Sequence, residues 1–378
     1  MEFVQLSLSE QILTGIFFFA VLIQLGYYWG LFSRLAFFKH RNKTQAVKPS
    51  ISVVIAARNE YHNLINNLPF ILEQDYPDFE VVVVNHASED DTGLLLKELQ
   101  GKFQHLKVVE IKQDLNFFKG KKFPLSIGIR EAKNEVLLLT DADCKPASKK
   151  WIENMATNYA SQNIEVVLGY GPYKKEKSFV NLLVRYDTFW VATQYLSMAL
   201  AGKPYMGVGR NLSYKKVLFY KTKGFISHYN IPSGDDDLFI SQVANKKNTT
   251  VELHKESFVY STPKKRLGEW FKQKKRHLKT SAQYKPAIKF LLGMFSFSQL
   301  IFYIFFLVLI LSGSMILQLV ASSGFLLRLI SQIIIHKKIS NTLDEGKLCA
   351  FSLLWEPFHL ILMTGIMVMS RLSRKKTW

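Results

Sequence analysis

The chain has 378 residues, with 49 Lys or Arg against 30 Asp or Glu, so its formal net charge is +19. Hydrophobic residues make up 48 % of the sequence, which excludes a disordered chain, because such chains contain too few apolar residues to form a core. Two cysteines, Cys144 and Cys349, exclude a disulfide framework and a zinc site built from thiolates. The positive charge favours contact with nucleic acid, an anionic membrane face or phosphorylated ligands.

The first uncharged segment, from Ile12 to Phe32, is 21 residues long. About 20 helical residues cross the apolar core of a bilayer. Basic residues follow it directly, whereas the tail before it is acidic: Arg34, Lys39 and Arg41 against Glu2 and Glu10. A cleaved signal peptide would instead begin with positive charge. We therefore expect residues 1–47 to form a transmembrane anchor, with a helix at about 12–32, and a basic linker. The positive-inside rule puts the N-terminus outside and the following domain in the cytoplasm.

The second uncharged stretch runs from Phe290 to Leu327, which is too long for one crossing. Ser312-Gly313-Ser314 interrupts it, so we expect a hairpin of two transmembrane helices at about 291–311 and 315–335. Arg328 lies inside the second of these helices. Its side chain must reach the interface or pair with a partner.

A last apolar segment, at about 350–370, completes the predicted membrane region 290–378. It contains Glu356-Pro357 and is followed by the basic residues Arg371, Arg374, Lys375 and Lys376. A simple crossing would place this basic tail outside, against the charge rule. A segment that re-enters the membrane with a bend at Pro357 would keep the tail inside. Both arrangements stay open.

The pattern changes between the apolar segments, where short apolar runs alternate with amphipathic ones. Continuous aliphatic runs predict buried strands at 51–57, 80–84, 106–111 and 135–140. Apolar residues at helical spacing predict helices at 59–74, 92–102 and 124–133. This alternation predicts an α/β domain with a parallel sheet, which we place at residues 48–263. Ligands of such sheets lie at the carboxyl ends of the strands.

Two acidic clusters follow predicted elements. Asp141-Ala142-Asp143 ends the fourth strand, where two carboxylates can hold Mg²⁺ or Mn²⁺ together with substrate phosphates. A solvated strand end is the other interpretation, and the residues alone do not decide. Ser233-Gly234-Asp235-Asp236-Asp237 brings three carboxylates together, so the pKa of at least one should rise unless a cation compensates. That suits a general base. The same residues also fit the start of a helix, which Asp237 would cap.

The segment 264–279 contains eight Lys or Arg residues and one acidic residue. Its apolar residues share one helical face, so we predict an amphipathic helix at the membrane surface within residues 264–289. Nucleic-acid binding is the other interpretation of the charge, but we expect no nucleic-acid partner, because no base-stacking motif accompanies it. A third role is to hold a diphosphate.

These motifs, in this order, resemble the family 2, inverting, membrane-integrated glycosyltransferases of the GT-A fold. That group includes hyaluronan, chitin and cellulose synthases and ceramide glucosyltransferase. The similarity covers about residues 50–280 and implies a Rossmann-like, mostly parallel sheet between transmembrane helices. The first strand and Arg58-Asn59-Glu60 are similar to the family's opening strand, whose end contacts the nucleotide. Asn85 and His86 stand where the family has an Asp pair.

The remaining motifs match by position. Asp141-Ala142-Asp143 resembles the DxD metal site, and Gly234-Asp235-Asp236 resembles a Gly-Asp-Asp motif whose second Asp is the base. Gln273-Lys274-Lys275-Arg276-His277 is similar to QxxRW, with His277 in place of the Trp. Lys121 and Lys122 follow a loop near the donor side, where they contact phosphate or form an exposed basic turn. Tyr205–Asn211 is an acceptor-facing turn or an ordinary β-turn.

The resemblance implies a metal-dependent, inverting transfer of a hexosyl or related sugar from a nucleotide-diphosphate donor. The acceptor would be a lipid or a saccharide, and the protein would be a multi-pass protein of the cell's inner (cytoplasmic) membrane with its catalytic domain in the cytoplasm. The implied metal ligands for Mg²⁺ or Mn²⁺ are Asp141 and Asp143. The implied base is Asp236, flanked by Asp235 and Asp237. The implied donor contacts are Ala57, Arg58, Glu60, Asn85, His86, Lys122 and Asp141, and those of the diphosphate and acceptor region are Gln273, Arg276 and His277.

A catalytically inactive, membrane-anchored protein that binds nucleotide sugars or acts as a scaffold is the alternative. An inactive relative would be expected to lose its carboxylates, yet Asp141, Asp143 and Asp236 are all present. A transporter would need more membrane crossings and polar residues at the bilayer midplane. The sequence therefore favours an enzyme.

Overall fold

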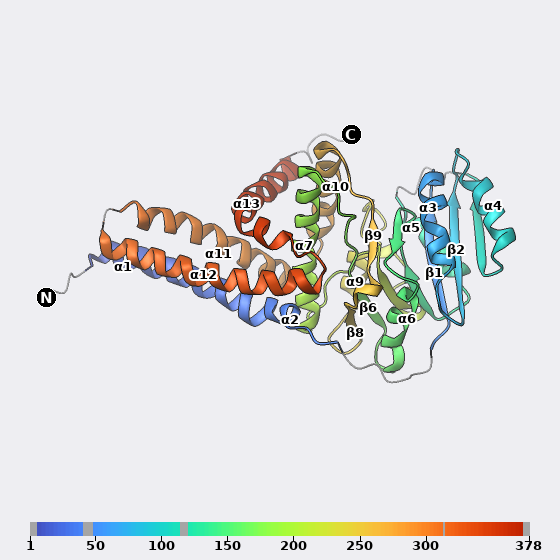
Figure 1. The fold of residues 1–378 in the computed structure, drawn as a ribbon, viewed down its shortest axis with the longest axis horizontal. Coiled ribbons are helices and arrows are strands. Elements are labelled where there is room, and N and C mark those ends of the chain that lie inside the picture. The colour runs from blue at the N-terminus through green and yellow to red at the C-terminus, as the bar shows by residue number, and fades with distance from the viewer. Residues whose placement is uncertain (1–5, 41–47, 114–119, 313, 373–378) are drawn as a thin grey trace. The chain divides into compact units, whose positions relative to one another are not determined.

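The computed structural model describes residues 6–40, 48–113, 120–312 and 314–372 (Figure 1). The chain divides into two compact units, one of Lys39–Tyr284 and one of Met1–Phe38 with Lys285–Trp378. Some residues used in the sequence analysis lie outside the described part: Glu2, Arg41, Gly313, Arg374, Lys375, Lys376 and the side chain of Arg371.

The unit of Lys39–Tyr284 is built on a seven-stranded sheet with the order β3-β2-β1-β4-β7-β6-β8. Its strands are β1 Ile51–Ala57, β2 Phe79–His86, β3 Leu106–Ile111, β4 Val136–Leu139, β6 Val166–Gly169, β7 Leu212–Lys215 and β8 Thr249–Glu252. β1 pairs in parallel with β2 and β4, β2 with β3, and β6 with β8. β7 runs antiparallel to both of its neighbours. The prediction of an α/β domain with a mostly parallel sheet is confirmed.

Short elements complete this unit. β5 Cys144–Pro146 and β9 Val259–Ser261 form a two-stranded antiparallel sheet. The helices are α3 Tyr61–Leu72, α4 Thr92–Lys102, α5 Lys122–Glu131, α6 Trp151–Ala156, α7 Phe179–Leu200, α8 Lys216–Lys221, α9 Asp237–Val243 and α10 Leu267–Ser281. α5 packs against β1 and β2, and α3 packs against β5. Between β4 and α10, the sequence analysis indicated only a helix start at Asp235–Asp237 and did not identify the other elements.

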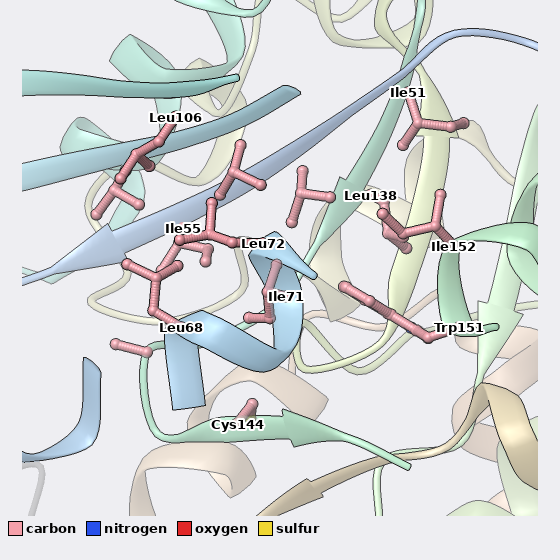
Figure 2. Close-up of a cluster of buried hydrophobic side chains, with 14 of the residues drawn as sticks. Ile51, Ile55, Leu68, Ile71, Leu72, Leu106, Leu138, Cys144, Trp151 and Ile152 are labelled. Carbon is pink, nitrogen blue, oxygen red and sulfur yellow. The ribbon is translucent and has the colours of Figure 1, made fainter. Parts of the chain in front are cut away.

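One hydrophobic cluster holds the sheet and its helices together (Figure 2). Alternate residues of β1, including Ile51 and Ile55, face the cluster because successive side chains of a strand point to opposite faces. Leu68 of α3 and Trp151 of α6 pack on the same side, and all four side chains are at most 1 % exposed. The strands end at the rim of this core, which places their carboxyl ends at one edge of the sheet.

The loops after β1 and β2 are tied to each other at that edge. Asn59 has a φ of 55°, and its side-chain Oδ1 accepts a hydrogen bond of 2.8 Å from the Glu89 backbone N–H. The Asn59 N–H donates in turn to Ser88 Oγ over 2.9 Å. The Glu60 N–H donates to Thr92 Oγ1, the side chain of the first residue of α4, over 3.0 Å. These bonds give the polar strand ends a defined position.

The other unit contains four helices that are long and apolar enough to cross a membrane, counted over the described residues. The first runs from Leu8 to Ala36 as α1 Leu8–Leu25, the π-helical segment Gly26–Phe32 and α2 Ser33–Ala36. The others are α11 Pro286–Ile310, α12 Met315–Thr342 and α13 Leu348–Leu372. α1, α11 and α12 lie side by side (Figure 1). α11 begins earlier and α12 ends later than the predicted 291–311 and 315–335, and α13 continues through Pro357 as one helix.

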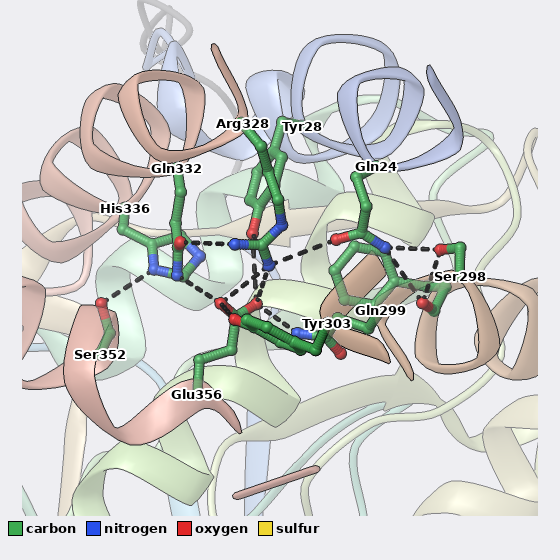
Figure 3. A network of polar contacts seen from close by, with 11 residues as sticks. Gln24, Tyr28, Ser298, Gln299, Tyr303, Arg328, Gln332, His336, Ser352 and Glu356 are labelled. Atoms are coloured by element: carbon green, nitrogen blue, oxygen red, sulfur yellow. Dashed lines mark hydrogen bonds and ion pairs between the residues drawn. The ribbon is translucent and has the colours of Figure 1, made fainter. Parts of the chain in front are cut away.

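A buried ion pair joins these helices (Figure 3). Nη2 of Arg328 on α12 lies 2.7 and 2.8 Å from the two carboxylate oxygens of Glu356 on α13. Gln332 and Tyr303 also donate to Glu356 Oε2, over 2.8 and 3.0 Å. Arg328 is 2 % exposed and Glu356 is 3 % exposed. Of the two environments that the sequence left open for Arg328, the structure therefore has the pairing with a partner.

We expect Arg328→Met to lower the stability of the unit of four long helices by about 3–5 kcal/mol, because Glu356 is then left as a buried charge without its partner. The double variant Arg328→Met with Glu356→Leu should recover much of the loss, since it removes both charges. Thermal unfolding of the full chain in detergent measures both effects. Lys337→Met, at an exposed position of the same helix, is the control. A double variant as unstable as the single one would contradict this explanation.

Candidate active site

A cavity of about 690 Å³ opens in the unit of Lys39–Tyr284 and is lined by the ends of several elements. Nearly all residues that the sequence analysis assigned to a site line it: Ala57, Arg58, Glu60, His86, Asp141, Asp143, Asp235, Asp236, Asp237, Gln273, Arg276 and His277. The cavity thus brings together the ends of β1, β2 and β4, the start of α9 and one face of α10.

Two predicted donor contacts, Asn85 and Lys122, do not line the cavity. The Asn85 amide donates to both carboxylate oxygens of Glu110 on β3, over 3.2 and 2.9 Å. Asn85 and the cavity-lining His86 are neighbours in β2, and neighbours in a strand face opposite sides. Lys122 is buried, and its Nζ donates to the carbonyl oxygens of His228 and Ile231 over 2.6 and 2.9 Å.

Lys121 occupies the cavity instead. Its Nζ lies 2.8 Å from Asp141 Oδ1 and 3.0 Å from Asp235 Oδ2. Burial lowers the pKa of Lys121, but the charges of Asp141 and Asp235 more than compensate and raise that pKa well above its usual range. Burial likewise raises the pKa of Asp141, but the Lys121 ammonium more than compensates and leaves it below its usual range. The ammonium therefore stays charged and joins the two acidic clusters.

Asp141 and Asp143 form a pair of carboxylates suited to a hard divalent cation. One oxygen of each and the Cys144 sulfur all lie within 4.8 Å of one another. Asp143 Oδ2 accepts a hydrogen bond of 3.0 Å from Ser261 Oγ, which orients it. Burial raises the pKa of the Cys144 thiol well above its usual range, so the sulfur stays protonated and is a poor ligand. The donor set that remains is two carboxylates with space for phosphate oxygens and water, which fits Mg²⁺ or Mn²⁺.

Glu60 supplies a further carboxylate beside this pair. Burial raises its pKa; the hydrogen bond from Asn63 opposes that effect, and the charges of Asp143 and Asp141 add to it. A group whose pKa is raised by neighbouring carboxylates lies in a region of excess negative charge. Such a region favours a cation.

The three consecutive aspartates have different partners. Asp236 is the N-cap of α9: its Oδ1 accepts from the Asp237 N–H over 2.7 Å, and its Oδ2 accepts from the Gly209 N–H over 2.8 Å. Capping by Asp237 was one of the interpretations left open; in the structure the N-cap is Asp236, and α9 begins at Asp237. Asp237 Oδ1 accepts from the Leu238 N–H over 2.7 Å, and its Oδ2 accepts from the hydroxyls of Thr280 and Tyr284 over 2.6 and 3.0 Å. Asp237 thus ties the start of α9 to the end of α10.

The pKa values of Asp235 and Asp237 follow from the burial of both side chains. Burial and the neighbouring charge of Asp236 raise the pKa of Asp237 to about 7, although the hydroxyls of Thr280 and Tyr284 act in the opposite direction. Burial also raises the pKa of Asp235, even though Lys121 opposes it. The predicted crowding of carboxylates is therefore present, with one cation compensating part of it.

α10 places the predicted diphosphate and acceptor residues along the cavity. Gln273 Nε2 donates to the Tyr173 hydroxyl over 3.2 Å. The His277 side chain is exposed to solvent at the cavity. Partial desolvation there, with the nearby charges of Lys274 and Arg276, lowers its pKa, so its ring is neutral at physiological pH. Lys274 is buried in an ion pair with Asp187 on α7 and therefore anchors the helix.

Sequence reasoning missed Arg210 and Tyr173. The guanidinium carbon of Arg210 lies 4.4 Å from the centre of the Tyr173 ring, and both residues line the cavity. Arg210 belongs to the segment Tyr205–Asn211, which was noted only as a turn with glycines. The cavity thus combines carboxylates with several cations: Arg58, Lys121, Arg210, Lys264 and Arg276. Such an arrangement can bind a diphosphate together with a divalent metal.

Comparison with known proteins shows which protein family the chain is similar to. Residues 52–222 match the family described as Glycosyl transferase family 2. The chain is 34 % identical over 113 residues to the "Probable glycosyltransferase YdaM" of Bacillus subtilis, covering 29 % of this chain and 25 % of that one. It is 22 % identical over 208 residues to an "Uncharacterized glycosyltransferase" of Haemophilus influenzae, covering 52 % and 60 %. The chain therefore spans less than two thirds of the length of these relatives.

A solved structure shows the same fold. The mannosyltransferase PcManGT from Pyrobaculum calidifontis, in complex with GDP-Man and Mn²⁺, is similar with a TM-score of 0.56 and 20 % identity over 92 % of this chain and 98 % of that one. The predicted GT-A type of fold, with long apolar helices before and after the domain, is confirmed.

We expect Asp237→Asn to change the pH dependence of stability. Because the pKa of Asp237 is about 7 in the folded chain and about 4 in an unfolded one, the protonated group stabilises the fold below pH 4. That stabilisation is lost as the pH rises through 7, by about 2 kcal/mol between pH 5 and pH 8. The Asn variant keeps an oxygen acceptor for Thr280 and Tyr284 but cannot ionise.

Thermal unfolding of both proteins in detergent, from pH 5 to pH 8, measures the effect. The wild type should lose stability relative to Asp237→Asn as the pH rises. Asp75→Asn, at an exposed position outside the cavity, is the control and should follow the wild type. A constant difference between Asp237→Asn and the wild type would contradict the raised pKa.

Proposed function

Since residues 52–222 belong to glycosyl transferase family 2, we propose that the chain is a metal-dependent, inverting glycosyltransferase. It transfers a hexosyl or related sugar from a nucleotide-diphosphate donor to a lipid or saccharide acceptor at the cytoplasmic face of a membrane. The single observation that carries this proposal is the cavity itself. It brings the Asp141 and Asp143 pair, the aspartates before α9 and the cations of α10 together in one space.

Two parts of the donor, its diphosphate and its nucleotide, contact different sides of the cavity. Asp141 and Asp143 would hold Mg²⁺ or Mn²⁺, which would supply charge neutralisation for the diphosphate leaving group. Arg276 and Arg210 line the same cavity and add cationic hydrogen-bond donors for phosphate oxygens. The ends of β1 and β2, through Ala57, Arg58, Glu60 and His86, form the side of the cavity proposed for the nucleotide.

Asp236 is the proposed general base. Lys121 holds an oxygen of Asp235, and two hydroxyls donate to Asp237, so these two aspartates already have side-chain partners. Asp236 accepts one backbone N–H on each oxygen. These bonds fix the direction of its carboxylate and leave each oxygen a further lone pair for an acceptor hydroxyl.

The reaction is then a single displacement. Asp236 removes the proton of the acceptor hydroxyl, and the acceptor oxygen forms a bond to the anomeric carbon. The bond between that carbon and the diphosphate oxygen breaks on the opposite side, and the nucleoside diphosphate leaves with the electron pair. Attack from the opposite side inverts the anomeric centre. His277, with its neutral ring, is a contact for the acceptor rather than a charge for the diphosphate.

The membrane helices support an acceptor at the membrane. Four helices of membrane-spanning length accompany the domain, and the basic residues beyond the first one favour a cytoplasmic domain. A nucleotide-sugar donor is also a cytoplasmic type of metabolite. The alternative is an inactive binding or scaffold protein. It is less favoured, because all the carboxylates that the reaction requires line the cavity.

Two variants test the separate roles. Asp143→Asn should lose most of the metal-dependent donor binding, because it removes half of the carboxylate pair. Asp236→Asn should keep donor binding but lower the transfer rate by roughly 10²–10⁴-fold, the usual contribution of a general base. Thermal shift with UDP, GDP and other nucleoside diphosphates, each with and without Mn²⁺, identifies the donor. Transfer or donor hydrolysis in detergent then gives the rates.

Asp235→Asn is the matched comparison for the base. If it abolishes transfer while Asp236→Asn stays near normal, the base is Asp235 and the family assignment stands. If every aspartate variant remains active, the cluster contains no base. If the wild type binds no nucleoside diphosphate, with or without metal, the proposed enzyme is rejected. The alternative of a protein that binds nucleotide sugars is rejected as well.

The proposed topology is tested by cysteine labelling in a Cys349→Ser background. Cysteine at position 2 should react with a membrane-impermeant reagent added outside the cell. Lys97→Cys, at an exposed position on α4, should react only after the membrane is opened. External labelling at position 97 would place the domain on the wrong side of the membrane for a cytoplasmic donor.

A further inference from the structure

One ammonium group links two parts of the site that serve different steps. Lys121 Nζ lies 2.8 Å from Asp141 Oδ1, in the proposed metal pair, and 3.0 Å from Asp235 Oδ2, beside the proposed base. Asp141 is one of the two carboxylates that would hold a divalent metal. The ammonium and the metal therefore require the same carboxylate.

The surrounding chain holds Lys121 in this position. The next residue, Lys122, is fixed by its bonds to the carbonyl oxygens of His228 and Ile231. On the other side, a methyl group on Gly209 would lie 3.1 Å from Lys121 Nζ and 3.3 Å from Asp236 Oδ2. The backbone of Gly209 thus closes one side of the space around the ammonium, and a side chain there would push against it.

The two carboxylates that Lys121 contacts differ in their environment. The Asp141 side chain is 35 % exposed, whereas the Asp235 side chain is 5 % exposed. Water can replace the ammonium at Asp141 at little cost, because half-exposed ion pairs contribute little. It cannot do so at Asp235, where loss of the cation leaves a buried charge. Lys121 is therefore free to leave Asp141 but not Asp235.

We propose that Lys121 is an internal cation that occupies Asp141 until the donor arrives, so that the metal binds well only together with the nucleotide. The proposal rests on the function proposed above and concerns the order in which its ligands bind. A free metal ion must displace the Lys121 ammonium from Asp141 without offering it another anionic partner. A nucleoside diphosphate that arrives with the metal brings phosphate oxygens, and these accept hydrogen bonds from the displaced ammonium.

The same contact connects donor binding to the proposed base. Lys121 remains beside Asp235, whose neighbour in the chain is Asp236, and the Asp236 carboxylate lies across Gly209 from the ammonium. When Lys121 turns from Asp141 toward the diphosphate, its ammonium keeps its contact with Asp235 and so stays close to Asp236. Lys121 is therefore a positioning residue that links the carboxylate pair proposed for the metal to the aspartate beside the proposed base.

The test measures metal binding without any turnover. Electron paramagnetic resonance of free Mn²⁺ is recorded while Mn²⁺ is titrated into the purified full chain in detergent, with no nucleotide. Lys121→Met should bind Mn²⁺ at least about tenfold more tightly than the wild type, as expected when one competing unit charge is removed from a half-exposed site. Lys121→Gln, which keeps a polar side chain, should show the same gain and serves as the second variant.

Two controls separate this effect from general charge. Lys121→Arg keeps the positive charge and should stay within about twofold of the wild type, since the competing charge is unchanged. Lys145→Gln removes a lysine two residues from Asp143, whose Nζ lies 3.3 Å from the centre of the Phe70 ring and which makes no ion pair with Asp141 or Asp143 among the contacts of the described residues. It should also leave Mn²⁺ affinity within about twofold.

Addition of the nucleoside diphosphate identified by thermal shift completes the experiment. It should raise the Mn²⁺ affinity of the wild type much more than that of Lys121→Met, since only the wild type has an ammonium to displace. Asp141→Asn in the Lys121→Met chain should remove the gain, because the gain depends on that carboxylate.

Each outcome decides a different point. Equal Mn²⁺ affinity of the wild type, Lys121→Met and Lys121→Gln would overturn the role of Lys121, while Mn²⁺ binding with a nucleotide would leave the proposed function intact. A gain that persists in the Asp141→Asn background would overturn it too, because the metal would then bind elsewhere. Failure of the wild type to bind Mn²⁺ with any nucleoside diphosphate would instead reject the proposed function.

Discussion

The concentration of negative charge at one edge of the sheet is the constraint on which the candidate site depends. Among the residues that the structure describes, six carboxylates line a single cavity: Glu60, Asp141, Asp143, Asp235, Asp236 and Asp237. Carboxylates this close raise one another's pKa or require cations. The chain uses both solutions: burial and charge raise the pKa of Asp237 to about 7, and Lys121 compensates Asp141 and Asp235. The negative charge that remains is what a divalent metal would compensate.

The scaffold holds this charge in place by ordinary packing. Aliphatic strands buried in the core bring their carboxyl ends to one edge, and the loops after β1 and β2 are tied together by Asn59. α10 is fixed at two points. Lys274 forms a buried ion pair with Asp187, and Asp237 accepts hydrogen bonds from the hydroxyls of Thr280 and Tyr284, at and just after the end of the helix. A residue of the acidic cluster therefore also positions the helix with Gln273 and Arg276.

The unit of four long apolar helices follows the same rule. Arg328 and Glu356 are buried among apolar helices, where an isolated charge is costly. Side-chain donors from α11 and α12 surround the carboxylate, so the pair is bound on several sides (Figure 3). This polar centre connects α11, α12 and α13 through bonds that apolar side chains cannot make. Each unit thus contains a buried ionic group that only its own fold satisfies.

The sequence by itself determined the local elements and the residue types of the site. Strands 51–57 and 106–111 and helix 92–102 agree with the structure to the residue, because long aliphatic runs and helical spacing are local signals. β5 to β9 have three or four residues each, too few for a periodic pattern, and their partners are distant in sequence. The acidic motifs and the basic helix were likewise readable, because charged residues gathered at strand ends and along one helix are visible in the chain itself. Only the tertiary structure decided which neighbour faces the cavity, His86 rather than Asn85 and Lys121 rather than Lys122. It also decided that Asp236 is the N-cap of α9 and that Asp237 bonds to Thr280, 43 residues away. Side-chain direction and long-range partners depend on packing between distant segments, and a linear pattern does not contain that information.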